Sequence, residues 1–144
     1  MASLSARRVE PSDEQHIQSV IMKALERAKK RCSKIWLHTI DIDCVMEMIR
    51  SRDTSYVVEG YLVVYDVVVP FYSRLPVLAE VMVLRIGRGG TISDVAAFLQ
   101  AKAQEAGCPT QHAGTAFSFN DDTLANLYIK EGFSQGGVSL CKVT

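Results

Sequence analysis

The middle of the chain carries a long run of β-branched and aromatic residues, and this run limits the fold more than any other feature. From Ser55 to Ile86 it reads SYVVEGYLVVYDVVVPFYSRLPVLAEVMVLRI, a composition that favours strands. A Glu-Gly pair predicts a tight turn early in the run, and two prolines flank a second connection. We therefore predict an antiparallel meander of three strands, Ser55 to Val58, Tyr61 to Val69 and Val77 to Ile86.

Helical periodicity appears on both sides of this run. Apolar residues recur at three- and four-residue intervals in two segments before it, which predicts two amphipathic helices. Two more helices and three short strands are expected elsewhere. The helices are expected from about 12 to 32, 41 to 50, 94 to 105 and 120 to 131, and the short strands at 5–10, 110–117 and 138–143. The predicted order is β-α-α-β-β-β-α-β-α-β, an α+β fold in α/β/α layers around a mixed central sheet.

Length and charge restrict the class of protein. With 144 residues, 48% of them hydrophobic, the chain suits one domain over residues 1–144. Lysine plus arginine and aspartate plus glutamate number 16 each, so no overall charge directs the chain to nucleic acid or to a membrane surface. A basic cluster at residues 29–34 has no interleaved aromatic residues. It is interpreted as a solvated helix end, with a nucleic-acid-binding module as a weaker alternative.

The cysteines and the N-terminus indicate the compartment. The four cysteines are widely spaced without a C-x-x-C pair, so neither a zinc site nor a redox motif is predicted. The N-terminal residues lack the apolar core of a signal peptide, and the longest apolar run is too short to cross a bilayer. These features predict a soluble, cytoplasmic protein with reduced thiols.

Two segments carry the chemistry. In NDDTLANLYIKEGF, Asn120 supplies an N-cap, Tyr128 lies on the apolar stripe, and Gly132 ends the helix. The second segment is the glycine-rich turn GRGGTIS before the third helix. Its glycines would let the backbone approach a phosphate, with N–H groups and the positive end of the helix dipole pointing at it. The alternative is that Thr91 and Asp94 form only a capping box.

These two segments, together with the order of elements, resemble the GNAT superfamily of acyl-CoA N-acyltransferases over nearly the whole chain. The family's phosphate loop reads Arg or Gln, two residues, Gly, one residue, then Gly or Ala. Here Thr91 and Ser93 stand at the two small-residue positions, and Asp121 stands where the family usually has asparagine. The central strands also resemble those of phage-encoded members, which would place the protein in the host cytoplasm.

The resemblance implies acetyl-CoA as co-substrate and a direct attack by the acceptor amine, without a covalent enzyme intermediate. Tyr128 would protonate the leaving thiolate, and Glu80 would accept the proton of the amine, with His112 and then Asp66 as alternatives. A main-chain N–H of the fourth strand would bind the acyl oxygen. The residues implied in cofactor binding are Val83, Leu84, Arg85, Arg88, Gly89, Gly90, Thr91, Ile92, Ser93 and Asn120.

The sequence therefore predicts an N-acetyltransferase that moves an acetyl group from acetyl-CoA to an amine of a small molecule, peptide or protein. The alternative is a catalytically degenerate protein of the same fold that acts by binding a protein partner. The imperfect phosphate loop and the apolar end of the third strand favour this alternative. A homodimer through exposed strands is also left open, and no metal is expected.

Overall fold

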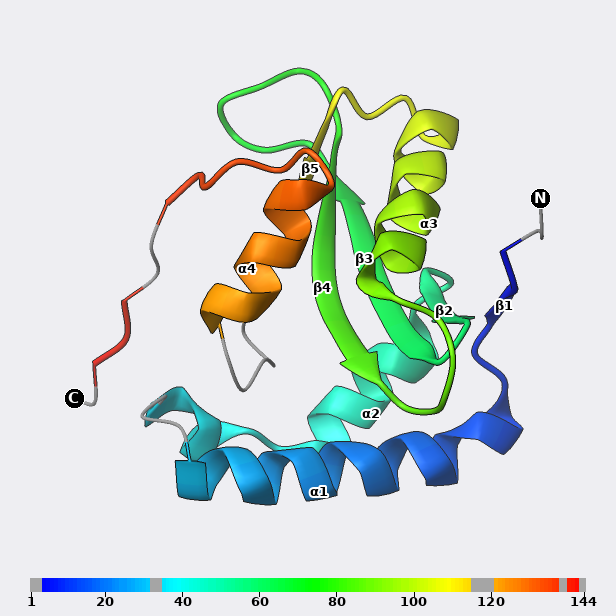
Figure 1. The fold of residues 1–144 in the computed structure, drawn as a ribbon, viewed down its shortest axis with the longest axis vertical. Helices are drawn as coiled ribbons and strands as arrows, with labels where there is room; N and C mark the ends of the chain where they lie inside the picture. Colours follow the sequence, from blue (N-terminus) through cyan, green and yellow to red (C-terminus); the bar gives the residue numbers. More distant parts are fainter. Residues whose placement is uncertain (1–3, 32–34, 115–120, 138–139, 143–144) are drawn as a thin grey trace.

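The computed structural model describes residues 4–31, 35–114, 121–137 and 140–142 (Figure 1). The strands are β1 (Ala6–Arg8), β2 (Ser55–Val58), β3 (Tyr61–Val68), β4 (Val77–Arg85) and β5 (Thr110–His112). The α-helices are α1 (Glu14–Arg31), α2 (Ile42–Ser51), α3 (Ile92–Glu105) and α4 (Asp121–Lys130), and two short 3-10 helices cover Pro11–Asp13 and Ile35–Thr39. None of these helices has the length and apolar character needed to cross a membrane.

The described strands form one mixed sheet in the order β1-β2-β3-β4-β5. Strands β1 to β4 pair antiparallel, which confirms the predicted meander and its turn at Glu59 and Gly60. Strand β5 is parallel to β4, and its three residues pair only with Val77 to Ala79. The predicted α+β class with a mixed sheet is confirmed.

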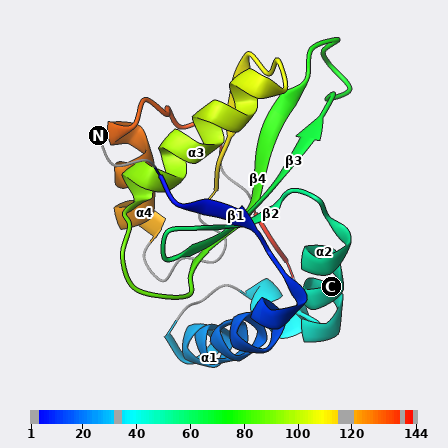
Figure 2. The ribbon, with the colours of Figure 1, turned by 90° about the vertical axis from the view of Figure 1, so that its right-hand side faces the viewer.

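Helices cover both faces of the sheet, with α3 and α4 on one side and α1 and α2 on the other (Figure 2). Each face has its own core. On the α3 face, Val95, Phe98 and Leu99 pack against Tyr61, Val63, Tyr65 and Leu78 of the sheet. On the other face, the buried side chains are Ile17, Ile21, Met46, Ile49, Leu62, Val64 and Met82. Burial of these apolar stripes holds the three layers together.

A bulge in β4 fixes which face its side chains take. Val64 pairs with Met82 but Tyr65 pairs with Glu80, so Val81 is an extra residue in the ladder. Without the bulge, Leu78, Glu80 and Met82 would share a face, because side chains alternate along a strand. Instead Leu78 packs in the α3 core and Met82 in the α1/α2 core. Glu80 lies opposite Tyr65 and therefore on the side of α3 and α4.

The last predicted strand does not form in the part of it that the structure describes. Residues 140–142 have no strand conformation, and residues 138, 139 and 143 lie outside the described ranges. The side chain of Leu140 is 90% exposed, so it gives the segment no apolar contact with the sheet. Helix α3 begins two residues before the predicted Asp94, because its N-cap is Thr91.

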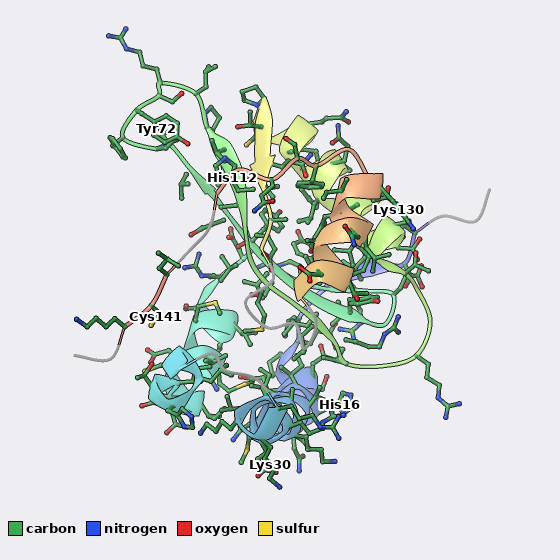
Figure 3. The ribbon with its side chains drawn as sticks, turned by 60° about the vertical axis from the view of Figure 1, so that its left-hand side comes forward. His16, Lys30, Tyr72, His112, Lys130 and Cys141 are labelled. Atoms are coloured by element: carbon green, nitrogen blue, oxygen red, sulfur yellow. The ribbon has the colours of Figure 1, made fainter. Side chains whose placement is uncertain are left out.

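The connection between β3 and β4 extends beyond the helices and exposes apolar side chains. Tyr72 lies at its tip (Figure 3). The most exposed of these side chains are Val69, Phe71, Tyr72 and Leu75, at 61, 100, 66 and 57%. The apolar end of the third strand, noted in the sequence, is therefore a surface feature and contributes little to either core.

Candidate active site

Glu80 is a half-buried carboxylate at the point where β4 loses its β5 partner. Its Oε2 accepts a hydrogen bond from the Gly114 N–H at 2.9 Å. Burial raises the pKa of Glu80 from 4.5 to about 7, although main-chain hydrogen bonds from Gly114 and Val83 oppose this shift. A carboxylate with such a pKa can hold or release a proton near neutral pH, as a general base requires.

Tyr128 lies on the same side of the sheet as Glu80. Its side chain is 4% exposed, and its hydroxyl has no hydrogen-bond partner within the part of the chain that the structure describes. Burial raises the pKa of the Tyr128 hydroxyl, and the nearby Glu80 and Tyr61 raise it further. The structure therefore brings the two predicted catalytic side chains together, with the tyrosine firmly protonated.

The position of Tyr128 depends on how α4 ends. Gly132 has a φ of 98°, a left-handed conformation that glycine adopts readily. The chain then turns back, so that the Phe133 N–H donates to the Tyr128 carbonyl at 3.2 Å. The two rings pack edge to face with centroids 5.2 Å apart. The predicted glycine stop and the return of Phe133 onto the helix are both confirmed, and they fix the tyrosine ring.

Beyond Ala79, the edge of β4 that faces β5 has no strand partner among the described residues. This open stretch includes Val83, Leu84 and Arg85, the residues expected to hold the pantetheine arm. Val83 packs against the α3 core and Leu84 against the α1/α2 core. The Val83 main chain hydrogen-bonds the Glu80 carboxylate. The Glu80 carboxylate therefore lies beside the part of the β4 main chain that the resemblance expects to bind the acyl oxygen.

The turn after β4 directs its carbonyl groups toward the protein. The Arg85 guanidinium donates to the carbonyls of Gly87, Gly89 and Gly90 at 3.0, 2.9 and 3.0 Å. A Cβ on Gly60 would lie 2.6 to 2.8 Å from the carbonyl oxygens of Gly89, Arg88 and Gly87. Gly60 is therefore required for this close approach. The carbonyls of residues 87 to 90 all face the same way, into the protein.

Peptide planarity then fixes the opposite side of the turn. In a trans peptide the N–H points away from the preceding C=O, so the N–H groups of Arg88, Gly89 and Gly90 face outward. None of these three N–H groups is hydrogen-bonded within the described ranges of the chain. Gly89 and Gly90 have φ values of 87° and 72°. Successive outward N–H groups of this kind form an anion-binding concavity.

The start of α3 adds both donors and negative charge. Asp94 accepts from the Thr91 N–H at 2.8 Å, so the capping box exists. The Ser93 hydroxyl donates to Glu131, at the end of α4. Ile92 is half-buried against the α3 core. The Thr91 and Ser93 hydroxyls, expected on phosphate oxygens, are thus turned toward carboxylates, while the N–H groups of residues 92 and 93 stay available.

The other predicted residues have separate positions. Arg88 is exposed and makes no hydrogen bond or ion pair with the described residues. Asn120 lies outside the described residues. His112 is exposed at the end of β5, opposite Ala79 (Figure 3). Asp66 forms an ion pair with Arg52 at 2.6 Å. Of the three candidate bases, Glu80 is half-buried beside Tyr128 and has a raised pKa, whereas His112 is exposed and Asp66 is held in its ion pair.

Sequence reasoning missed four contacts of the turn. For Arg85, the sequence predicted only a main-chain contact with the pantetheine arm. For Gly60, it predicted only a place in the hairpin turn. His16 of α1 hydrogen-bonds the Ile86 carbonyl at 2.6 Å, and Glu131 takes the Ser93 hydroxyl. In the structure the left-handed residue of this turn is Glu59, with a φ of 52°, so Gly60 is needed for close packing and not for a positive φ. The sequence carries no signal for this role.

Comparison with known proteins identifies the fold. No family model matches the chain, and no curated protein matches it significantly by sequence. Among solved structures, a GNAT-family acetyltransferase from Listeria monocytogenes is 14% identical, with a TM-score of 0.63 over 94% of this chain and 89% of that one. AAC(6')-Iy, bound to the bisubstrate analog CoA-S-monomethyl-acetylneamine, is 11% identical, with a TM-score of 0.59 over 99% of both chains.

A third similar structure is an aminoglycoside acetyltransferase from an uncultured soil metagenomic sample. It is 12% identical, with a TM-score of 0.58 over 99% of both chains. Identities this low relate the architectures and leave the chemistry to be argued from the residues. This chain has the fold of the GNAT-family acetyltransferases.

Proposed function

We propose that the protein is an acetyl-CoA-dependent N-acetyltransferase. The observation that carries this proposal is that the buried Tyr128 hydroxyl, which has no hydrogen-bond partner among the described residues, lies near the half-buried Glu80 carboxylate beside the open edge of β4. An acid and a base with different pKa values, placed in one site, are what acyl transfer between a thioester and an amine requires. Similar solved structures include AAC(6')-Iy in complex with CoA.

In the proposed reaction, Glu80 in its ionised form accepts a proton from the acceptor ammonium. The amine nitrogen then attacks the thioester carbonyl, and a main-chain N–H of β4 at Val83 to Arg85 binds the oxyanion. When the carbon–sulfur bond breaks, Tyr128 donates its hydroxyl proton to the departing thiolate, and the Tyr128 phenolate then takes the second surplus proton from the attacking nitrogen. The products are an N-acetylated acceptor and CoA.

The cofactor would lie along the edge of β4 with its diphosphate at the turn before α3. The N–H groups of Arg88, Gly89 and Gly90 face outward there, and the start of α3 adds the N–H groups of residues 92 and 93. The Arg88 side chain is exposed beside them and supplies positive charge. These groups suit an anion better than the loop sequence alone indicates.

For the amine acceptor, the similar solved structures suggest a first class of compounds to test. Two of them are aminoglycoside acetyltransferases, so aminoglycosides are the first amines to test. Peptide and protein amines remain acceptors of the same chemistry. The exposed Phe71, Tyr72 and Leu75 are where a second copy of the chain, or another protein, would find apolar contact.

The experiment is a thiol-release assay with acetyl-CoA and a panel of aminoglycosides, polyamines and lysine peptides. The proposal predicts CoA release that depends on both acetyl-CoA and an amine. Absence of amine-dependent release, together with binding of a protein partner, would instead support the catalytically degenerate alternative.

A further inference from the structure

We propose that Arg85 is a positioning residue for the cofactor diphosphate. Its guanidinium holds the carbonyls of the glycine-rich turn on the protein side, so that the N–H groups of Arg88, Gly89 and Gly90 stay directed outward. This inference rests on the proposed function, because it assigns a role within the same cofactor site. The sequence predicted a role only for the main chain of Arg85, whereas this inference concerns its side chain.

The contacts of Arg85 use the shape of the guanidinium. Nη1 donates to the carbonyls of Gly87 and Gly89, while Nη2 donates to the carbonyl of Gly90 and to the Tyr61 hydroxyl at 2.8 Å. The guanidinium carbon lies 4.3 Å from the centroid of the Tyr61 ring. A planar fork with several donors can bind three carbonyls and stack on a ring at once. Lysine has a compact ammonium and cannot reproduce this arrangement.

Two neighbours support the same orientation from other elements. The carbonyl of Gly60 accepts from the N–H groups of Ile86 and Gly87 at 2.9 and 3.1 Å, which fixes the start of the turn on the β2–β3 hairpin. The His16 side chain of α1 binds the Ile86 carbonyl from the other side. The turn is therefore tied to α1, to β3 and to the end of β4.

The turn needs this support because of its composition. Gly89 and Gly90 occupy left-handed conformations, and glycines have more freedom than other residues to leave them. The turn also departs from the family pattern at Thr91 and Ser93, whose hydroxyls are engaged by carboxylates. Arg85 fixes the carbonyls, and planarity of each peptide then fixes the N–H group that follows. Preorganised donors bind an anion without an ordering cost.

The test compares acetyl-CoA with S-acetylpantetheine, which lacks the diphosphate. Steady-state kinetics are measured for the unmodified protein, Arg85→Gln, Arg85→Lys and a control, Arg74→Gln, at an exposed arginine of the β3–β4 connection. In both Arg85 variants, KM for acetyl-CoA should rise about tenfold or more, the effect of losing a charge-assisted hydrogen bond. The kcat values and KM for S-acetylpantetheine should stay within about twofold. The Arg74 control should change neither substrate.

A second variant tests the same geometry without touching Arg85. Gly60→Ala places a Cβ against the three carbonyl oxygens, so they must move, and it should also raise KM for acetyl-CoA selectively. Retained turnover of S-acetylpantetheine shows that each variant is folded.

Equal losses with both thioesters, or no loss with acetyl-CoA, would overturn the inference for Arg85 while leaving the proposed function in place. An unmodified protein that turns over neither thioester would overturn both. An unmodified protein with the same KM for the two thioesters would show that the turn does not bind the diphosphate, and would overturn the role of Arg85.

Discussion

Burial raises the pKa of both Glu80 and Tyr128, but it leaves the two groups in different protonation states near neutral pH. Burial raises the pKa of Glu80 to about 7, so this carboxyl changes charge near neutrality. Burial also raises the pKa of Tyr128, which keeps the hydroxyl protonated. One residue can therefore accept a proton while its neighbour donates one, and the pH dependence of the reaction should follow Glu80.

We expect kcat/KM to rise with pH through about 7 and then level off, because only ionised Glu80 accepts the amine proton. In Glu80→Gln this rising limb should disappear, and the rate should fall by about 10²-fold or more. A pH–rate profile of both proteins provides the measurement. A rising limb that persists unchanged in the variant would assign the base to another group, with His112 as the next candidate.

Glu80 should also make stability depend on pH. Its pKa is raised in the folded state, from 4.5 to about 7, so the folded state holds the proton more tightly than the unfolded state does. The free energy of unfolding should therefore fall as pH rises from about 4.5 to about 7, by at most about 3 kcal/mol. Urea unfolding of Glu80→Gln should lack this component and show a gain above pH 7. A larger gain at pH 4.5 than at pH 8 would contradict the shift.

Tyr128→Phe should separate stability from activity. The Tyr128 hydroxyl is buried without a partner among the described residues, so its removal should leave the free energy of unfolding unchanged or raise it by about 1 kcal/mol. Turnover should fall, because the thiolate loses its proton donor, while the affinity for acetyl-CoA stays nearly unchanged. Thermal unfolding and steady-state kinetics measure the two effects. Unchanged turnover would remove Tyr128 from the mechanism.

The contact between α3 and α4 places a carboxylate near the proposed diphosphate site. Glu131 accepts the Ser93 hydroxyl at the start of α3, where the helix dipole favours an anion. In Glu131→Gln the acceptor is kept and the negative charge is removed. Acetyl-CoA should then bind several-fold more tightly at low salt, since one charge at about 4 Å is worth about 1 kcal/mol in water.

The matched control is Glu105→Gln, at the opposite end of α3, which should leave the affinity unchanged. The gain from Glu131→Gln should shrink at high salt, because exposed charges are screened. Weaker binding in Glu131→Gln would show that its charge contributes to the order of the turn more than it repels the ligand.

Local patterns predicted the elements well and their junctions poorly. The β-branched run and the turn at Glu59 and Gly60 predicted the meander, because neighbouring residues determine hairpins. The helix ending at Gly132 was predicted for the same reason. The strand over residues 138–143 was expected from a short apolar pattern, yet Leu140 is exposed. Burial depends on what covers a segment, and a local pattern does not contain this information.

In the candidate site, too, some features could be predicted from the sequence and others depend on contacts between distant segments. Tyr128 and Glu80 were found by resemblance, but the bulge at Val81 that puts Glu80 on the side of Tyr128 has no local signal. The contact of Arg85 with the turn joins residues close in sequence, yet it depends on Tyr61 and Gly60 from another strand. Such contacts arise from how the hairpins pack, and only the folded chain reveals them.

In the whole molecule, the proposed base and acid lie at the open edge of β4, and the turn proposed to bind the diphosphate follows the end of this strand. These features form one site only if the same ligand spans both. A thioester of CoA meets this requirement, because its diphosphate and its reacting carbonyl are separated by the pantetheine arm. Under the proposed function, binding across both features is what would distinguish acyl transfer from simple anion binding at a helix terminus.

Calorimetric titration of acetyl-CoA tests this arrangement most directly. The unmodified protein should bind acetyl-CoA saturably at one site, and Arg88→Glu should weaken binding by about tenfold or more, because it places a negative charge beside the diphosphate. No heat of binding at millimolar acetyl-CoA would contradict the proposed cofactor site, and equal affinity in Arg88→Glu would place the ligand away from the turn.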